Sequence, residues 1–150
     1  METLHDIVSK YEPFTNPASI VAYLHKVQAK WFNSPWERMG AIPLNASGYP
    51  LGVEFMSEGS EDTCQTCTRK LFKLIFSKRK YASATSFVLV HNHPSGNASP
   101  SEADDRVTRA VMEAGILLDF QMLDHIIISP LDNMYSFRRV HCDWWEHSDK

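Results

Sequence analysis

The chain has 150 residues, of which 43% are apolar, and it carries a formal net charge of -3 at pH 7. This size and apolar content suit one domain with one buried core, and the acidic balance provides no overall positive field to hold a nucleic acid. No apolar stretch reaches the roughly 18 residues of a membrane span, and the N-terminus lacks the apolar segment of a signal peptide, so we expect a cytoplasmic protein without membrane contact.

The first third of the chain predicts a helix followed by a hairpin. Asn16 is suited to cap a helix over residues 17–31, where apolar residues recur at helical spacing. Two strand-like runs between residues 36 and 56 flank a turn sequence at 45–48. In the second run apolar residues alternate with other residue types, which predicts that Glu54 lies on the face opposite the apolar one.

The rest of the chain alternates helices and strands. A helix is expected over residues 63–77, a strand covered on both faces over 85–90, and a helix over 101–115. Two strands then follow at 120–129 and 134–137. The order of elements predicts a mixed α/β (α+β) fold, in which a mixed sheet is flanked by helices in layers.

Both ends of the chain are expected to be peripheral. We expect the folded domain to cover residues 15–139, with an N-terminal tail at 1–14 and a C-terminal tail at 140–150. Trp144 and Trp145 in the second tail are candidates for docking a partner chain.

Candidate metal ligands follow the central strand, in the sequence HNHPSGNASPSEADD at residues 91–105. Because side chains alternate along a strand, His91 and His93 project to the same side. Asp104 falls in the first turn of the next helix beside its apolar stripe, where a carboxylate needs a compensating charge. Two imidazoles and one carboxylate give three protein ligands and leave a fourth position open, as catalytic zinc sites require. Ser101 lies one turn before Asp104 and can point its hydroxyl at the same place.

The same residues have a purely structural interpretation. Ser101 and Asp104 have the spacing of a capping box, and caps account for the serines of this segment. Caps do not account for two histidines at strand spacing that a proline follows directly.

The pattern His-x-His, seven residues, then Ser-x-x-Asp resembles the JAMM metalloprotease motif of the MPN, or JAB, domain. Here it consists of His91, His93, Ser101 and Asp104. The resemblance implies the layered fold of that domain and a zinc site formed by the two histidines and the aspartate.

The bacterial RadC-like branch of this family resembles the chain in more detail. The string HNHPSG and the later run LDHIII at residues 123–128 are typical of that branch, and the likeness extends over residues 17–138. Asn97 stands where the branch usually has Asp. RadC proteins commonly carry a helix-hairpin-helix segment before this domain. The chain leaves no room for one, so we expect a short, stand-alone member.

The resemblance implies a zinc metallopeptidase. Zinc (Zn2+) on His91, His93 and Asp104 would lower the pKa of its bound water to roughly 7, and that water would attack a peptide or isopeptide carbonyl. Glu54 would act as the general base and then protonate the leaving amine, while Ser101 would stabilise the oxyanion. The substrate implied is a peptide or protein, whose identity the sequence does not indicate.

The position of the general base rests on the resemblance. Glu54 precedes Gly59 by five residues, which matches the spacing of a glutamate before a Gly-Thr pair in the branch. Glu58 and Glu61 are the competitors, but they lie in a polar turn and are better explained as solvated loop acids.

Two other functions stay open. The RadC name carries a DNA-repair association, so the domain could be a recombination or repair module in which the metal is structural or vestigial. Its candidate phosphate contacts are the basic residues Arg69, Lys70, Lys73, Lys78, Arg79 and Lys80, which also fit a solvated helix end.

A partner-binding scaffold ranks lowest among the functions considered, because the chain keeps the metal-binding positions. Nothing in the sequence indicates the oligomeric state.

Four further residues carry weaker signals. Cys64 and Cys67 form a single C-x-x-C without a second pair, so we expect small core residues rather than a zinc ribbon, and an odd total of three cysteines fits a reducing compartment. Asp124 and His125 either support the metal ligands through hydrogen bonds or are structural.

Overall fold

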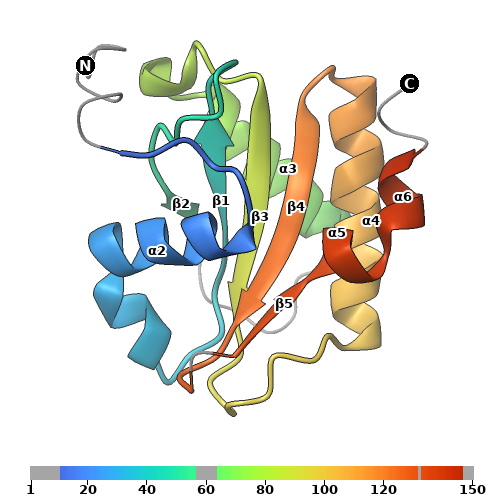
Figure 1. Ribbon diagram of the computed structural model, residues 1–150. Coiled ribbons are helices and arrows are strands. Elements are labelled where there is room, and N and C mark those ends of the chain that lie inside the picture. The colour runs from blue at the N-terminus through green and yellow to red at the C-terminus, as the bar shows by residue number, and fades with distance from the viewer. Residues whose placement is uncertain (1–10, 57–63, 132, 147–150) are drawn as a thin grey trace.

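The computed structural model describes residues 11–56, 64–131 and 133–146 (Figure 1). Its centre is a five-stranded sheet in the order β2-β1-β3-β4-β5. The strands are β1 (Met39–Leu44), β2 (Glu54–Phe55), β3 (Ser86–Asn92), β4 (Gln121–Ile128) and β5 (Met134–Ser136). Strands β3 and β4 are parallel and the other neighbours are antiparallel, so the expected mixed sheet is confirmed.

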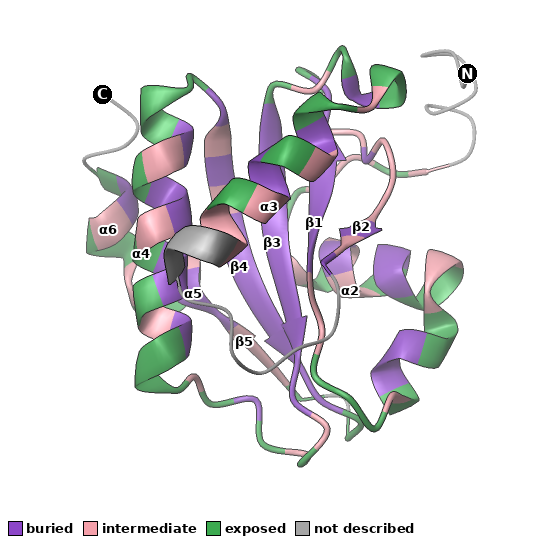
Figure 2. Ribbon diagram, turned by 180° about the vertical axis from the view of Figure 1, so that it is seen from behind, coloured by how far each residue is buried: buried purple, intermediate pink, exposed green. Residues whose placement is uncertain are grey.

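Helices cover both faces of this sheet (Figures 1 and 2). One face carries α2 (Pro17–Val27) and the 3-10 helix η1 (Ala29–Asn33), and the other carries α3 (Cys64–Phe76) and α4 (Glu102–Leu117). Short helices complete the chain: η2 (Arg79–Tyr81), α5 (Phe137–Val140) and α6 (Cys142–Glu146). Within the described ranges no helix combines the length and apolar character needed to cross a bilayer.

Strand β3 lies at the middle of the sheet, and every residue of it is buried. Phe87 and Leu89 pack toward α3 and α4, whereas Val88 and Val90 pack toward α2. This confirms the strand that the apolar run predicts. The alternation continues to the end of the strand, and it therefore sets the direction of the residues that follow Val90.

The first predicted helix and the hairpin differ from expectation in detail. Gln28 leaves the helical conformation with φ -140 and ψ 44, so α2 ends at Val27 and the rest of the predicted helix is η1. The second strand of the hairpin is reduced to Glu54–Phe55, because Gly52 has φ +156 and interrupts the alternation. Glu54 is buried, at 8% exposure, instead of lying on a solvent face.

The expectation that residues 140–150 are peripheral is wrong for α6. Trp145 is 2% exposed and belongs to the core cluster of α3 and α4. Its Nε1 donates a hydrogen bond to the carbonyl of Met122, 2.8 Å away. Trp144 stacks on His141 with ring centroids 4.1 Å apart. Trp145 is thus part of the core and is not displayed for a partner chain.

Replacing Trp145 with Ala is expected to lower the free energy of unfolding by roughly 3 to 5 kcal/mol, because a large buried ring is lost and a cavity remains. Urea denaturation followed by circular dichroism measures this. The matched control is Trp36→Ala, since Trp36 is 65% exposed and its loss should cost about 0.5 kcal/mol or less. Equal stability of the Trp145 variant and the parent would contradict the packing of α6.

Candidate metal centre

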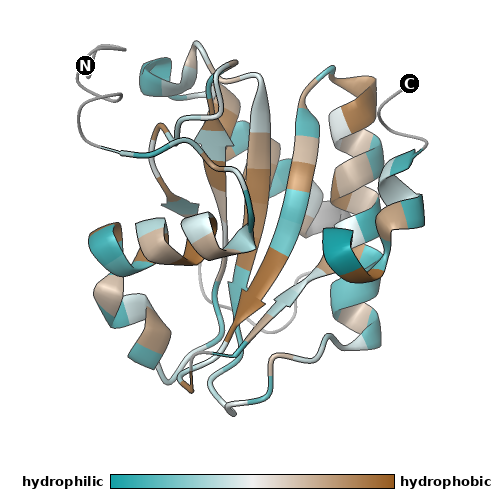
Figure 3. Ribbon diagram, in the orientation of Figure 1, coloured by the Kyte–Doolittle hydropathy of each residue, from teal (hydrophilic) through white to brown (hydrophobic). Residues whose placement is uncertain are grey.

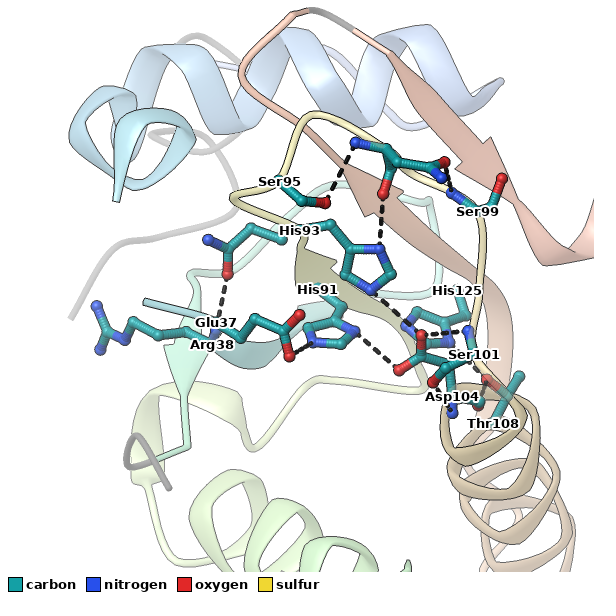
Figure 4. A network of polar contacts seen from close by, with 12 residues as sticks. Glu37, Arg38, His91, His93, Ser95, Ser99, Ser101, Asp104, Thr108 and His125 are labelled. Atoms are coloured by element: carbon teal, nitrogen blue, oxygen red, sulfur yellow. Dashed lines mark hydrogen bonds and ion pairs between the residues drawn. The ribbon is translucent and has the colours of Figure 1, made fainter. Parts of the chain in front are cut away.

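The end of β3 brings two histidines together (Figure 4). His91 is the next-to-last residue of the strand, and His93 stays attached to the sheet because its N–H donates to the carbonyl of Ile128. The two rings lie 4.9 Å apart, and the residues are 7% and 9% exposed. Nδ1 of His93 donates to the carbonyl of Asn97, 2.9 Å away. In a neutral ring this bond keeps the proton on Nδ1, so Nε2 is free to bind a cation.

Asp104 faces both histidines from the first turn of α4. Its Oδ1 lies 3.3 Å from His91 Nδ1, and its Oδ2 lies 3.2 Å from His93 Nε2. Oδ2 also accepts the N–H of Ser101, and Ser101 Oγ accepts the N–H of Asp104, which completes a capping box. The metal-ligand and capping interpretations are therefore compatible, because the carboxylate of Asp104 both belongs to the capping box and faces the two histidines.

A glutamate that the sequence analysis did not select lies on the other side of His91. Oε2 of Glu37 is 3.7 Å from His91 Nε2, and its side chain is 62% exposed. Glu37, His91 and His93 each offer a ligand atom, and these atoms all lie within 4.8 Å of one another, so this group could hold a metal ion. Glu37 precedes β1, whose first residue pairs with His91. The pairing of β1 with β3 brings it to this end of the sheet.

The structure does not bring Glu54 to this cluster. Glu54 pairs with Ala41, which pairs with Leu89, so two strand spacings and two residues separate it from His91. From the dimensions of a sheet, the two Cα atoms are about 12 Å apart.

The Glu54 carboxylate has other partners. It accepts hydrogen bonds from Tyr81 Oη and Lys78 Nζ, both at 2.6 Å, and Lys80 Nζ lies 3.2 Å away. Burial raises the pKa of Glu54, but these partners outweigh it and lower the pKa. The role of Glu54 as general base stays a prediction without support from this geometry. The competitors Glu58 and Glu61 lie outside the described residues.

The histidines and carboxylates of the cluster shift one another's pKa values. Burial lowers the pKa of His91, but Asp104 and Glu37 outweigh it and raise the pKa to about 9. Burial raises the pKa of Asp104, but the two histidines and the N–H of Ser101 hold it well below its usual range. The pKa of Glu37 is lowered, mainly by its contact with His91. At neutral pH both carboxylates are therefore ionised.

These residues fit a divalent ion. Nδ1 of His91 is buried and makes no hydrogen bond of acceptable geometry, although Asp104 is close. A buried ring nitrogen without a partner is unfavourable in the protein alone, and a cation between the imidazoles and a carboxylate would satisfy it. Two nitrogen ligands and one oxygen ligand are typical of catalytic zinc sites, and other divalent ions also accept them.

A buried histidine of β4 lies beside this cluster (Figure 4). Figure 3 shows a hydrophilic stretch within that strand. His125 is fully buried, and burial lowers its pKa well below the usual value. Thr108 Oγ1 donates to the carbonyl of Asp104 at 2.6 Å, so His125 Nδ1, also at 2.6 Å, donates to the threonine oxygen. His125 thus contacts the turn of α4 that carries Asp104.

Asp124 has a structural role at the opposite face. Its carboxylate accepts hydrogen bonds from Ser136 Oγ and from the N–H groups of Arg138 and His125. Burial raises its pKa, although these bonds oppose the shift. Asp124 therefore joins β4, β5 and α5, and these hydrogen-bond partners do not include the candidate metal ligands.

Two weaker candidates can also be placed. Cys67 is half-buried against the core, as expected of a small core residue, and the side chain of Cys64 lies outside the described part of the chain. In the basic run, Lys78 and Lys80 are paired with Glu54.

A family model for the RadC-like JAB domain matches residues 14–142. The chain belongs to the RadC-like JAB domain family. The resemblance drawn from the histidine motif is thereby confirmed, and the five-stranded sheet with helices on both faces is consistent with the fold of that family.

Curated relatives of this RadC-like domain come from several bacteria. The UPF0758 protein of Chlorobium chlorochromatii (strain CaD3) is 36% identical over 102 residues, which cover 68% of this chain and 44% of that protein. The UPF0758 protein of Desulforudis audaxviator (strain MP104C) is 33% identical over 127 residues, or 85% and 52%. That of Gloeothece citriformis (strain PCC 7424) is 32% identical over 130 residues, or 87% and 50%. The chain spans about half the length of these relatives.

Proposed function

We propose that this RadC-like JAB domain is a zinc-dependent metallohydrolase that cleaves a peptide or isopeptide bond. The observation that carries the proposal is the convergence of His91, His93 and Asp104 at one end of the sheet, with Glu37 beside them. A carboxylate next to a metal-binding cluster, but not required as its third ligand, is the arrangement that general-base hydrolysis needs.

Three residues would hold the ion in this proposal: His91, His93 and Asp104. When bound, zinc supplies a Lewis acid and an activated water at an open coordination position. The capping box with Ser101 and the bond from Thr108 fix the carboxylate of Asp104 and its helical turn. The bond from His93 Nδ1 to Asn97 fixes the orientation of the second imidazole.

Glu37 takes the role of general base in place of Glu54. Its carboxylate lies at the histidine cluster, and it is exposed enough to reach both a water and a bound substrate. Its pKa is lowered by the contact with His91, so the carboxylate is ionised at neutral pH, which is the protonation state that a general base requires. The same carboxylate, once protonated, would deliver the proton to the leaving amine nitrogen.

Ser101 would stabilise the oxyanion that develops on the attacked carbonyl. It is exposed at the N-terminus of α4, and its oxygen accepts the N–H of Asp104, so its own proton is available to donate. Loss of a single donor of this kind typically costs roughly 3 to 4 kcal/mol in the barrier.

Removal of the metal tests the proposal. A library of fluorogenic peptides is incubated with the protein, with the protein treated with 1,10-phenanthroline, and with the treated protein after zinc is added back. We expect hydrolysis that the chelator abolishes and zinc restores, and no hydrolysis by the His93→Ala variant. Hydrolysis that survives the chelator and persists in the His93→Ala variant would contradict a zinc mechanism.

The alternative of a DNA-associated module has less support in the described residues. Two of the three cations in the basic run 78–80 are engaged by Glu54, so their charge is partly neutralised. That function would require salt-dependent DNA binding that weakens when these cations are removed.

A further inference from the structure

Glu37 lies beyond the last paired residue of its strand. The pairing of β1 with β3 begins at Met39, which lies opposite His91. Residues 36–38 therefore need another support if the Glu37 carboxylate is to stay beside the histidines. Figure 4 shows Glu37 and Arg38 alongside the end of β3.

The side chain of Asn92 provides this support. Its Nδ2 donates to the carbonyl of Trp36 at 2.9 Å, and its Oδ1 accepts the N–H of Arg38 at 2.7 Å. These two bonds hold the main chain immediately before and after Glu37. The main-chain N–H of Asn92 also donates to the carbonyl of Arg38, at 3.3 Å.

Asn92 is itself held in place. It is 2% exposed, and Trp31 Nε1 donates a further hydrogen bond to its Oδ1 at 3.0 Å. A buried amide with both of its ends engaged has one orientation, because reversing it would set donor against donor. The amide supplies both the acceptor for Arg38 and the donor for Trp36.

The position of Asn92 between the histidines gives it this geometry. Successive side chains of a strand alternate, so His91 and His93 face the metal site while Asn92 faces Trp31 on the other side of the sheet. One stretch of three residues thus carries two metal-binding groups and the group that anchors Glu37.

We propose that Asn92 is a positioning residue for catalysis: by holding residues 36–38, it sets where the Glu37 carboxylate lies relative to the histidines. The inference rests on the proposed function, in which Glu37 is the general base. The side chain of Asn92 bonds Trp31, Trp36 and Arg38 and faces away from the histidines, so its loss should impair proton transfer and leave metal binding intact. A displacement of about 1 Å is enough to slow a reaction roughly 100-fold.

The test compares Asn92→Ala with Asn45→Ala. Asn45 lies at the other end of β1, is also buried, and accepts hydrogen bonds from the N–H groups of Ser47 and Tyr49. Both variants lose buried side-chain bonds to the main chain, but only Asn92 is next to Glu37. A third variant, Asn92→Asp, keeps both accepted bonds and loses the donor to Trp36, so the inference is still tested if the alanine variant does not fold.

Three quantities are measured on each zinc-loaded protein: zinc content, kcat for the fluorogenic peptide that the parent cleaves fastest, and amide hydrogen exchange of Arg38. We expect Asn92→Ala to keep its zinc, to lose roughly 100-fold in kcat and to exchange faster at Arg38. Asn45→Ala should match the parent in all three. In a Glu37→Gln background, Asn92→Ala should cause no further loss, because the group that it positions is already gone.

Different results separate this inference from the proposed function. If Glu37→Gln is inactive while Asn92→Ala keeps the kcat and the Arg38 protection of the parent, the inference is overturned and the proposed function stands. If Glu37→Gln is fully active, Glu37 is not the base: the inference about Asn92 falls, and the proposed hydrolase would need a different base. A further loss of kcat in the double variant, equal to that in Asn92→Ala alone, would also overturn the positioning role.

Discussion

Replacing Glu37 with Gln is expected to slow peptide hydrolysis by roughly 100-fold to 10,000-fold, with little change in zinc content. Gln keeps the size of the side chain but cannot accept the proton of an attacking water. Steady-state kinetics and metal analysis of the same preparation give both quantities. Loss of zinc together with activity would mean that Glu37 is a ligand, since it could also complete a metal group with His91 and His93.

The matched control is Glu54→Gln, because the resemblance alone assigns the base to Glu54. Its carboxylate is engaged by Tyr81 and Lys78, and Tyr81 is itself buried. We expect this variant to lose roughly 1 to 3 kcal/mol of stability and to keep its kcat. A folded Glu54 variant that is inactive, beside an active Glu37 variant, would reinstate Glu54 as the base and contradict the geometric argument.

Replacing Asp104 with Asn is expected to abolish zinc binding and to reduce the pH dependence of the free energy of unfolding. In the metal-free protein the pKa of His91 is raised from 6.5 to about 9. Because the folded state holds this proton more tightly, its contribution is complete below about pH 6.5 and is lost as the pH rises through about 9. The contribution is on the order of 3 kcal/mol.

Urea denaturation of metal-free protein at pH 6 and pH 9.5 measures this effect. The parent should be less stable at the higher pH, and Asp104→Asn should show a much smaller difference. Glu102→Gln is the control, since Glu102 lies in the same helical turn but is exposed and contacts Arg106 instead of the histidines. A parent whose stability is the same at both pH values would contradict the coupling between His91 and Asp104.

The parts of the site that the sequence predicts are those that depend on local geometry. His91 and His93 share a direction because they are two residues apart on a strand, and Asp104 lies in the first helical turn because Ser101 caps it. The apolar run before His91 requires burial on both faces. Each of these features follows from neighbours within a few residues, and the structure agrees with each.

The parts that the sequence does not predict depend on tertiary pairing. Glu37 reaches the histidines because β1 runs antiparallel to β3, and no local pattern identifies that pairing. Glu54 is buried among cations because Gly52 interrupts the hairpin and the segment after α3 covers its face. No local pattern predicts that Trp145 is buried, because its partner Met122 is 23 residues away in the sequence.

The metal content of the purified protein tests the central claim most directly. The parent, His93→Ala and Asp104→Asn are supplied with zinc, freed of excess by gel filtration and analysed by plasma mass spectrometry, with folding checked by circular dichroism. The proposed site predicts about one zinc per chain in the parent and a large loss in both variants. A folded parent that stays free of metal after zinc is supplied would contradict the metal centre and the hydrolase built on it.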